Sequence, residues 1–136
     1  MATNARLCSA SRDLALNAAL DVMNSGFLRL YDSTQPTDAD TALGAQVLLA
    51  ELGLNATAWA AASSGSKAAN AITADSSANT TGTCTWSSFV TSGSVRKWDF
   101  SAGTASVNLI LNTASIVAGA NVSVSSFTAT LASGPG

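Results

Sequence analysis

The amino-acid sequence predicts a mainly β protein, an antiparallel β-sandwich or jelly roll with one N-terminal helix. Two observations support this fold class. Residues 1–26 hold a segment whose apolar residues recur with helical spacing. The rest of the chain alternates short β-prone runs with turn-forming residues, as sandwiches and jelly rolls do. We therefore expect an N-terminal segment with a helix, residues 1–26, and a β-sandwich domain, residues 27–136.

The predicted helix covers residues 11–23. Ser11 is a favourable N-cap residue, and the carboxylate of Asp13 suits the positive end of the helix dipole. Gly26 is expected to end the segment in a left-handed conformation. Between these signals, apolar residues recur at three to four positions, Leu14 with Ala18 and Leu16 with Leu20, and form an apolar stripe on the helix.

The apolar stripe of this helix needs a covering surface. Two alternatives remain open at this point: the β domain of the same chain covers the stripe, or a partner subunit does. The second alternative makes the stripe a candidate interface, formed by Leu14, Leu16, Ala18 and Leu20.

Several segments of the β domain have the composition of strands. Phe27–Tyr31 is a compact apolar strand, and residues 46–54 are predicted as a strand buried on both faces, despite their leucine content. Further strands are expected at residues 69–73, 83–90, 95–100 and 107–111, of which 83–90 and 95–100 form a hairpin.

The final strand changes its alternation. Its apolar residues have even numbers at Val122 and Val124 and odd numbers at Phe127 and Ala129. All of them face the core only if one extra residue is inserted between the two runs, which is what a β-bulge does. The sequence therefore predicts a bulge at residues 125–126.

The charge composition excludes several functional classes. Lys and Arg total 6, Asp and Glu total 8, histidine is missing, and the net charge is −2. Six scattered cations cannot form a phosphate-binding patch, so no nucleic-acid partner is expected. A membrane-spanning helix needs about 20 consecutive apolar residues, and no apolar run approaches this length, so no membrane partner is expected either. Without histidine, active sites and zinc sites that depend on this residue cannot form. We expect no metal or other cofactor.

The supply of large apolar residues is modest, because Ala, Ser and Thr dominate the composition. Ordering a residue opposes folding by about 1–2 kcal/mol for the backbone alone, so the stability of an isolated chain is expected to be small. We therefore expect the protein to gain stability from neighbours, as a homo-oligomer (a dimer or trimer) or as a subunit of a lattice.

Two combinations of polar residues have a possible chemical role and a simpler interpretation. Ser64 and Lys67 have the Ser-x-x-Lys spacing of some serine hydrolases, but the other elements of that class are missing, and a flexible loop is favoured. Asp32, Asp38 and Asp40 could offer oxygen ligands to a cation, although aspartates are also ordinary turn residues, and that interpretation is favoured.

Two pairs of reactive groups are also interpreted as structural. Cys8 and Cys84 have no histidine partner, and both are expected as thiols, with Cys84 in the core. Glu51 and Asp99 could form the carboxylate pair of a glycosidase, but surface charges on two strands are the favoured interpretation.

The tryptophans leave two alternatives. Trp59, Trp86 and Trp98 could form a platform on which a sugar stacks, but anchors of the core or of an interface are favoured. Arg96 and Lys97 are adjacent cations, which are expected on a solvated strand face. No catalytic residue is assigned, and we expect the protein not to be an enzyme.

Several short stretches follow one another in a fixed order along the chain, from SGFLRLYD at residues 25–32 to NTASIVAG at residues 112–119. Between them lie residues 34–36, 40–42, 48–52, 83–86 and 95–99. In pattern and order these stretches resemble a family of small virion proteins of tailed bacteriophages, over roughly residues 20–131.

The resemblance implies a structural protein of the phage head, similar to capsid decoration or cement proteins. Its partner would be the major capsid protein, and its location would be the virion, assembled in the host cytoplasm. Two alternatives remain: a component of the neck, tail or head fibre, and a host-surface or carbohydrate-binding module.

Overall fold

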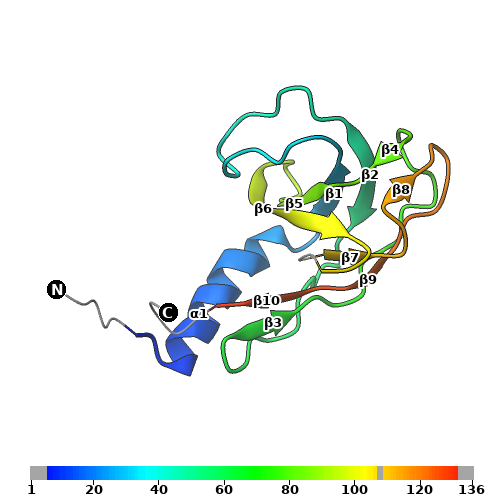
Figure 1. The fold of residues 1–136 in the computed structure, drawn as a ribbon. Helices are drawn as coiled ribbons and strands as arrows, with labels where there is room; N and C mark the ends of the chain where they lie inside the picture. Colours follow the sequence, from blue (N-terminus) through cyan, green and yellow to red (C-terminus); the bar gives the residue numbers. More distant parts are fainter. Residues whose placement is uncertain (1–5, 107–108, 132–136) are drawn as a thin grey trace.

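The computed structural model describes residues 6–106 and 109–131, and within them a mainly β fold with one helix is confirmed. The helix α1 (Ser9–Leu20) continues as a short 3-10 turn, η1 (Asp21–Met23), and only strands follow it (Figure 1). The strands are β1 (Phe27–Tyr31), β2 (Leu48–Gly53), β3 (Ser66–Ala68), β4 (Gly82–Thr83), β5 (Trp86–Val90), β6 (Arg96–Gly103), β7 (Leu109–Leu111), β8 (Ser115–Ile116), β9 (Val124–Ser126) and β10 (Thr128–Thr130).

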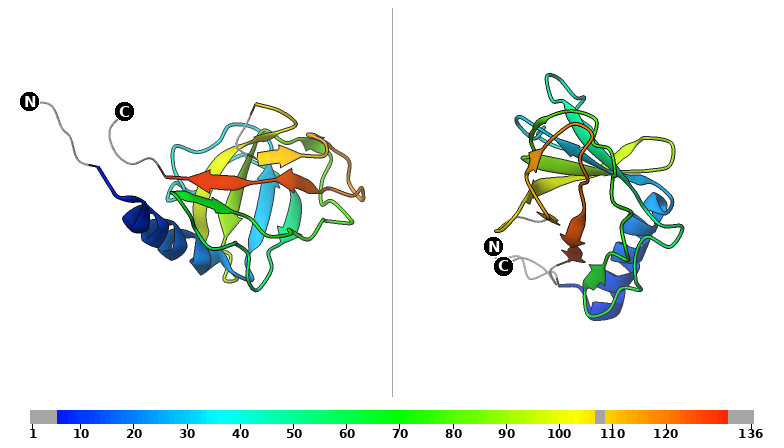
Figure 2. Two further views of the ribbon diagram at one scale, coloured as in Figure 1. Left: turned by 90° about the horizontal axis from the view of Figure 1, so that it is seen from below. Right: turned by 90° about the vertical axis from the view of Figure 1, so that its right-hand side faces the viewer.

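The described strands form a six-stranded sheet with the order β2-β1-β5-β6-β7-β9 and two short ribbons, β10–β3 and β4–β8. The β3–β10 ribbon crosses one face of the curled sheet (Figure 2, left). Among these strands, β6 and β7 pair in parallel, so the expected purely antiparallel arrangement is wrong and the sheet is mixed. Alternation along a sequence shows which residues share a face, but it does not show the direction of a strand. The sandwich or jelly roll stays a prediction.

The centre of the sheet follows the sequence prediction. The apolar run Phe27–Tyr31 is strand β1, and the expected hairpin of residues 83–90 with 95–100 is the antiparallel pair β5–β6. The leucine-rich segment is strand β2, whose residues Leu49, Ala50 and Leu52 are fully buried. A segment without helical caps that is buried on both faces is favoured as a strand, even where its residues have high helix propensity.

The strand expected at residues 69–73 is wrong, because the strand lies earlier, at Ser66–Ala68. Ser64 and Gly65 both have positive φ, 52° and 76°, as a two-residue hairpin turn requires. This turn folds the chain back, so that Ser63 and Ser66 exchange backbone hydrogen bonds. Pairing therefore starts directly after the turn, and Thr73 makes only an isolated bridge to Gly53.

The expected bulge in the final strand is confirmed. Ile110 pairs with Ser126 and Leu111 with Val124, so the register skips Ser125. The chain then leaves the six-stranded sheet and pairs with β3 as strand β10. Because of the extra residue, Phe127 is only 5% exposed and points to the core. Val107, at the start of the strand expected at 107–111, lies outside the described residues.

The ends of the helix differ from the prediction in two places. The N-cap residue is Cys8, and Ser11 lies within the first turn instead. At the other end, Ser25 takes the positive φ of 60°, and Gly26 does not. Gly26 is needed for space, since a Cβ at this position would overlap the carbonyl oxygen of Val90 and lie 2.9 Å from that of Met23.

The core between the sheet and the β3–β10 ribbon is built on aromatic packing. Phe127 lies between 4.9 and 5.7 Å from four other rings, measured between ring centroids; three of these contacts are edge-to-face and one is tilted. The four rings belong to Trp59, Phe89, Trp98 and Phe100. Helix α1 adds Leu16 and Leu20 to this core, and η1 adds Met23. None of the helices in the described residues is long and apolar enough to cross a membrane.

The close approach at Gly26 generates a prediction. Gly26→Ala is expected to lower the free energy of unfolding by roughly 1–3 kcal/mol, because the added methyl group meets backbone atoms that cannot move away. Gly44→Ala is the matched control, since the nearest atom would lie 3.7 Å away, and it is expected to change stability by less than about 0.5 kcal/mol. Urea unfolding of both variants checks this, and equal stability of the two would contradict the prediction.

Candidate functional site

Helix α1 is attached to the β body through a buried lysine. Lys67 in β3 is only 2% exposed, and its Nζ donates to Asn17 Oδ1 at 2.6 Å and lies 3.1 Å from Asp21 Oδ1. A buried ammonium group is tolerated only where such partners replace water. The Ser64–Lys67 pair is therefore not a catalytic dyad, because the lysine is directed to the helix. The favoured flexible loop is a tight hairpin turn instead.

The other charges of this helical segment are also engaged with the β body. Arg12 Nη1 donates to the carbonyl oxygen of Leu131 at 3.3 Å. Asp13 Oδ1 accepts a hydrogen bond from the backbone N–H of Gly65 at 2.8 Å. Together with Asp21, these are the charged residues of α1 and η1. Each of them has a partner in the body, and the Asp21 side chain is still 49% exposed.

The predicted interface stripe is split by this orientation. Leu16 and Leu20 are 7% and 3% exposed and belong to the core of the same chain. Leu14, by contrast, is 71% exposed, and Ala18 is exposed beside it. We define the outer face of α1 as the exposed, uncharged residues Ser11, Leu14, Ala15, Ala18 and Val22.

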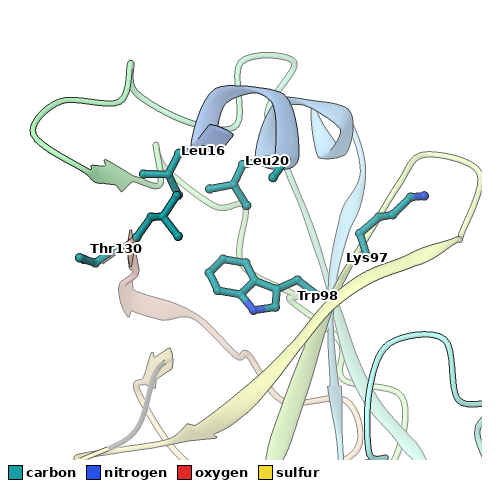
Figure 3. Close-up of a pocket in the computed structure, with 7 residues that line it drawn as sticks. Leu16, Leu20, Lys97, Trp98 and Thr130 are labelled. Atoms are coloured by element: carbon teal, nitrogen blue, oxygen red, sulfur yellow. The ribbon is translucent and has the colours of Figure 1, made fainter. Parts of the chain in front are cut away.

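A groove lies on the opposite side of the helix. It has a volume of about 300 Å³ and lies between α1, the start of β6 and the end of β10 (Figure 3). We name it the β6–β10 groove; it is lined by Leu16, Ala19, Leu20, Lys97, Trp98, Thr130 and Leu131. Trp98 points into the groove, whereas the ammonium group of Lys97 points away from it (Figure 3). The walls are therefore mainly apolar, with one cation at the rim.

Arg96 is the polar centre of the sheet face opposite the β3–β10 ribbon. Its guanidinium group forms an ion pair with Asp99, lies 5.6 Å from the Trp86 ring, and donates to the carbonyl oxygens of Thr41 and Asp38 at 2.5 and 3.2 Å. The expected solvated strand face is wrong here, because the Arg96 and Asp99 side chains are only 11% and 2% exposed. Sequence analysis did not identify this site, because Thr41 and Asp38, whose carbonyl oxygens Arg96 binds, lie more than 50 residues away along the chain.

A β-bulge explains why Arg96 and Asp99 meet. Val90 pairs with Arg96 and Phe89 with Trp98, so Lys97 is the extra residue of the bulge. With strict alternation, positions 96 and 99 would lie on opposite faces of the sheet, and the extra residue brings them to the same face.

Arg96 holds the long loop of residues 32–47 over this face (Figure 1). Beneath the loop, Tyr31 stacks on Trp86 with 4.5 Å between ring centroids, and burial raises the pKa of Tyr31. The loop is closed at its base, where Asp32 Oδ1 accepts from the N–H of Val47 at 2.7 Å. A long loop with fixed ends and an exposed tip is a common place for function.

The remaining candidates are turn, core or surface residues. Among the described residues no three His, Cys, Asp or Glu side chains converge. Asp32 and Asp38 accept hydrogen bonds from backbone N–H groups of their own loop, as aspartates in turns do. Asp38 accepts from the hydroxyl and the N–H of Thr41, which holds the pKa of this carboxyl below its usual range. Asp32 closes the loop, and Asp40 donates its N–H to Asp38.

The tryptophans and carboxylates are also separated. Trp59 and Trp86 are 3% and 1% exposed, so they are core anchors and cannot form a sugar platform. Trp98 is half-buried at the groove. Glu51 pairs with Arg29 at 2.6 Å, in an ion pair separate from that of Asp99, so the two carboxylates do not act together.

Loss of the Arg96 anchor is expected to weaken the fold and free the loop. Arg96→Ala should lower the free energy of unfolding by about 3–5 kcal/mol, because Asp99 would remain buried without its partner. Limited proteolysis should then cut within residues 32–47. Arg29→Ala is the matched control, since its ion pair with Glu51 is more exposed, and its cost should stay near about 1 kcal/mol. A resistant loop in Arg96→Ala would contradict this role.

The two thiols are expected to differ in reactivity. Cys8 is exposed, and hydrogen bonding from Ser11 lowers its pKa, whereas burial raises the pKa of Cys84 to about 12. A thiol reagent at pH 8 should therefore label one cysteine in the folded protein and both in urea.

The same burial predicts a pH dependence of stability. Above pH 9.0, the ordinary pKa of the thiol, Cys84 ionises in the unfolded chain only, so stability should fall as the pH rises from 9.0 towards about 12. Cys84→Ala should reduce this slope relative to the wild type, as measured by urea unfolding. If the free energy of unfolding falls with pH equally steeply in Cys84→Ala and in the wild type, Cys84 is not the source of the pH dependence.

Comparison with known proteins adds no assignment: no family model, curated protein or solved structure matched this chain. The functional argument therefore starts from the outer face of α1, the β6–β10 groove and the loop held by Arg96.

Proposed function

We propose that this chain is a bacteriophage virion structural protein that decorates the capsid. In this proposal it binds the major capsid protein as a lattice-bound subunit, stabilises the shell, and catalyses no reaction. The observation that carries the proposal is the uncharged outer face of α1. The resemblance of the sequence to small phage virion proteins, over roughly residues 20–131, supports it.

The outer face of α1 is unusual for a helix on a protein surface. A surface helix normally turns its charged residues to the solvent and its apolar residues to the core. Here Arg12, Asp13 and Asp21 are bound to the β body, and Leu14 is 71% exposed. Such a face has no charge to desolvate when another protein covers it, and each apolar Å² removed from water contributes about 25 cal/mol.

A decoration protein also needs little affinity per copy. A protein that binds the assembled lattice better than the dispersed subunits stabilises the lattice by linkage. A contact the size of the outer face of α1, repeated over many copies, is sufficient for this when the copies act together. The same face suits contact between copies of this chain, as expected for a homo-oligomer.

The sandwich or jelly-roll description of the β domain belongs to the same proposal. The β3–β10 ribbon crosses one face of the six-stranded sheet, and the aromatic core lies between them (Figure 2). Two β layers with a shared core are the arrangement that a sandwich requires.

The outer face is tested by one substitution. Leu14→Asp is expected to reduce binding to purified capsids at least about tenfold in co-sedimentation, since a carboxylate would be buried without a partner. Its stability should stay within about 0.5 kcal/mol of the wild type, because the side chain is exposed. Val117→Asp is the matched control, because Val117 is 55% exposed and lies far from α1, next to β8. Equal binding by Leu14→Asp and the wild type would contradict the proposal.

Immunogold labelling of virions separates the alternative positions. A decoration protein should give label spread over the whole head, whereas label confined to one vertex, the neck or the tail would overturn the decoration role.

A further inference from the structure

Among the described residues, strand β10 is paired along one edge only. Leu131 N–H donates to Gly65 and Ala69 N–H donates to Phe127, so the odd-numbered residues of this segment exchange hydrogen bonds with the β3 side. In an antiparallel ladder, the backbone groups of successive residues point to opposite edges. The N–H and C=O groups of Thr128 and Thr130 therefore point away from β3, where no other described strand pairs with them.

Among the described residues, the first half of β6 is also paired along one edge. β6 pairs with β5 from Arg96 onwards, and the described part of β7 pairs with it at Ala102 and Gly103. The β6–β10 groove lies between this part of β6 and the free edge of β10. An unpaired strand edge therefore adjoins an apolar groove, and α1 forms the third wall (Figure 3).

We propose that this groove binds an extended peptide segment of a partner protein, which adds as a strand to β10. Free strand edges recognise extended segments through backbone hydrogen bonds, while pockets beside the edge select alternate side chains. Leu16, Leu20 and Trp98 form the apolar walls, and the volume of about 300 Å³ accepts an apolar side chain.

The charges around the groove define the flanking residue of the peptide. Lys97 is the charged lining residue, with its ammonium group at the rim, and Arg12 lies beside Leu131 at the other end. None of the described residues that line the groove is acidic. The matching segment therefore carries an apolar side chain with a carboxylate next to it, and a basic segment is disfavoured.

This inference does not depend on capsid binding. The groove uses Leu16 and Leu20, which face the β body, whereas the outer face of α1 presents Leu14 to the solvent. Leu14→Asp therefore tests the proposed function and leaves the groove intact.

The test uses an acetylated heptapeptide of alternating Thr and Leu that ends in Glu, titrated into the whole protein. NMR of the labelled protein should show protection of the Thr128 and Thr130 amides and a shift of the Trp98 indole signal. Thr130→Pro removes a backbone donor that β3 does not use, and it should weaken binding at least about tenfold. A peptide N-methylated on alternate residues is the matched control, because it keeps the side chains but cannot pair.

A charge reversal keeps the proposal testable even if Thr130→Pro fails to fold. Lys97 is exposed, so Lys97→Glu should fold, bind the Glu peptide several-fold more weakly, and bind a Lys-ended peptide better than the wild type does. Equal binding of the methylated peptide, equal affinity of Lys97→Glu for both peptides, or no binding at all would overturn the proposal. The protein could also dimerise without any peptide. If Thr130→Pro abolishes such a dimer, the groove binds a second copy of this chain, and the peptide proposal is overturned.

Discussion

The packing of Phe127 is the constraint on which the arrangement of the β layers depends. Its ring contacts Trp59 and Phe89 edge-to-face, and it lies where the chain passes from the sheet to the ribbon. Turning this ring inward requires the extra residue at Ser125, and the pairing with β7 ends directly after it, at Ser126. The chain then pairs with β3, and no other described strand pairs with the opposite edge of β10. One buried aromatic side chain thus determines the crossing of the layers and the position of the groove.

The buried Lys67 fixes the helix on this framework in one orientation. Apolar contacts alone would not decide which side of α1 is buried, since Leu14 and Leu16 lie about 200° apart and each side of the helix carries a leucine. The ammonium group of Lys67 would be strongly destabilising without Asn17 and Asp21 as partners. A rotated helix would lose both, so the polar contact selects the face that Leu16 and Leu20 present. Specificity of orientation is a recognised use of buried polar groups.

The sequence predicts faces better than it predicts partners. Alternation correctly placed β1, β2 and the β5–β6 hairpin, and the phase change at residues 125–126 revealed the bulge, because side-chain period and burial are local properties. It could not show that β7 runs parallel to β6, or that residue 97 is a bulge. In the candidate interface, Leu14 and Leu16 each have an apolar residue four positions later, so the sequence does not distinguish them. The tertiary contacts of Lys67 decide which of the two is exposed.

The loop of residues 32–47 has a consequence for engineering. Arg96 holds the carbonyl oxygen of Thr41, and Gln46 Nε2 holds that of Thr34 at 2.6 Å, so both sides of the exposed tip at residues 42–45 are fixed by contacts outside it. The entropy of closing a loop grows slowly, by about 0.6 kcal/mol for each doubling of its length. The tip is therefore a suitable insertion point for a foreign epitope, which the protein would display without a change in its core.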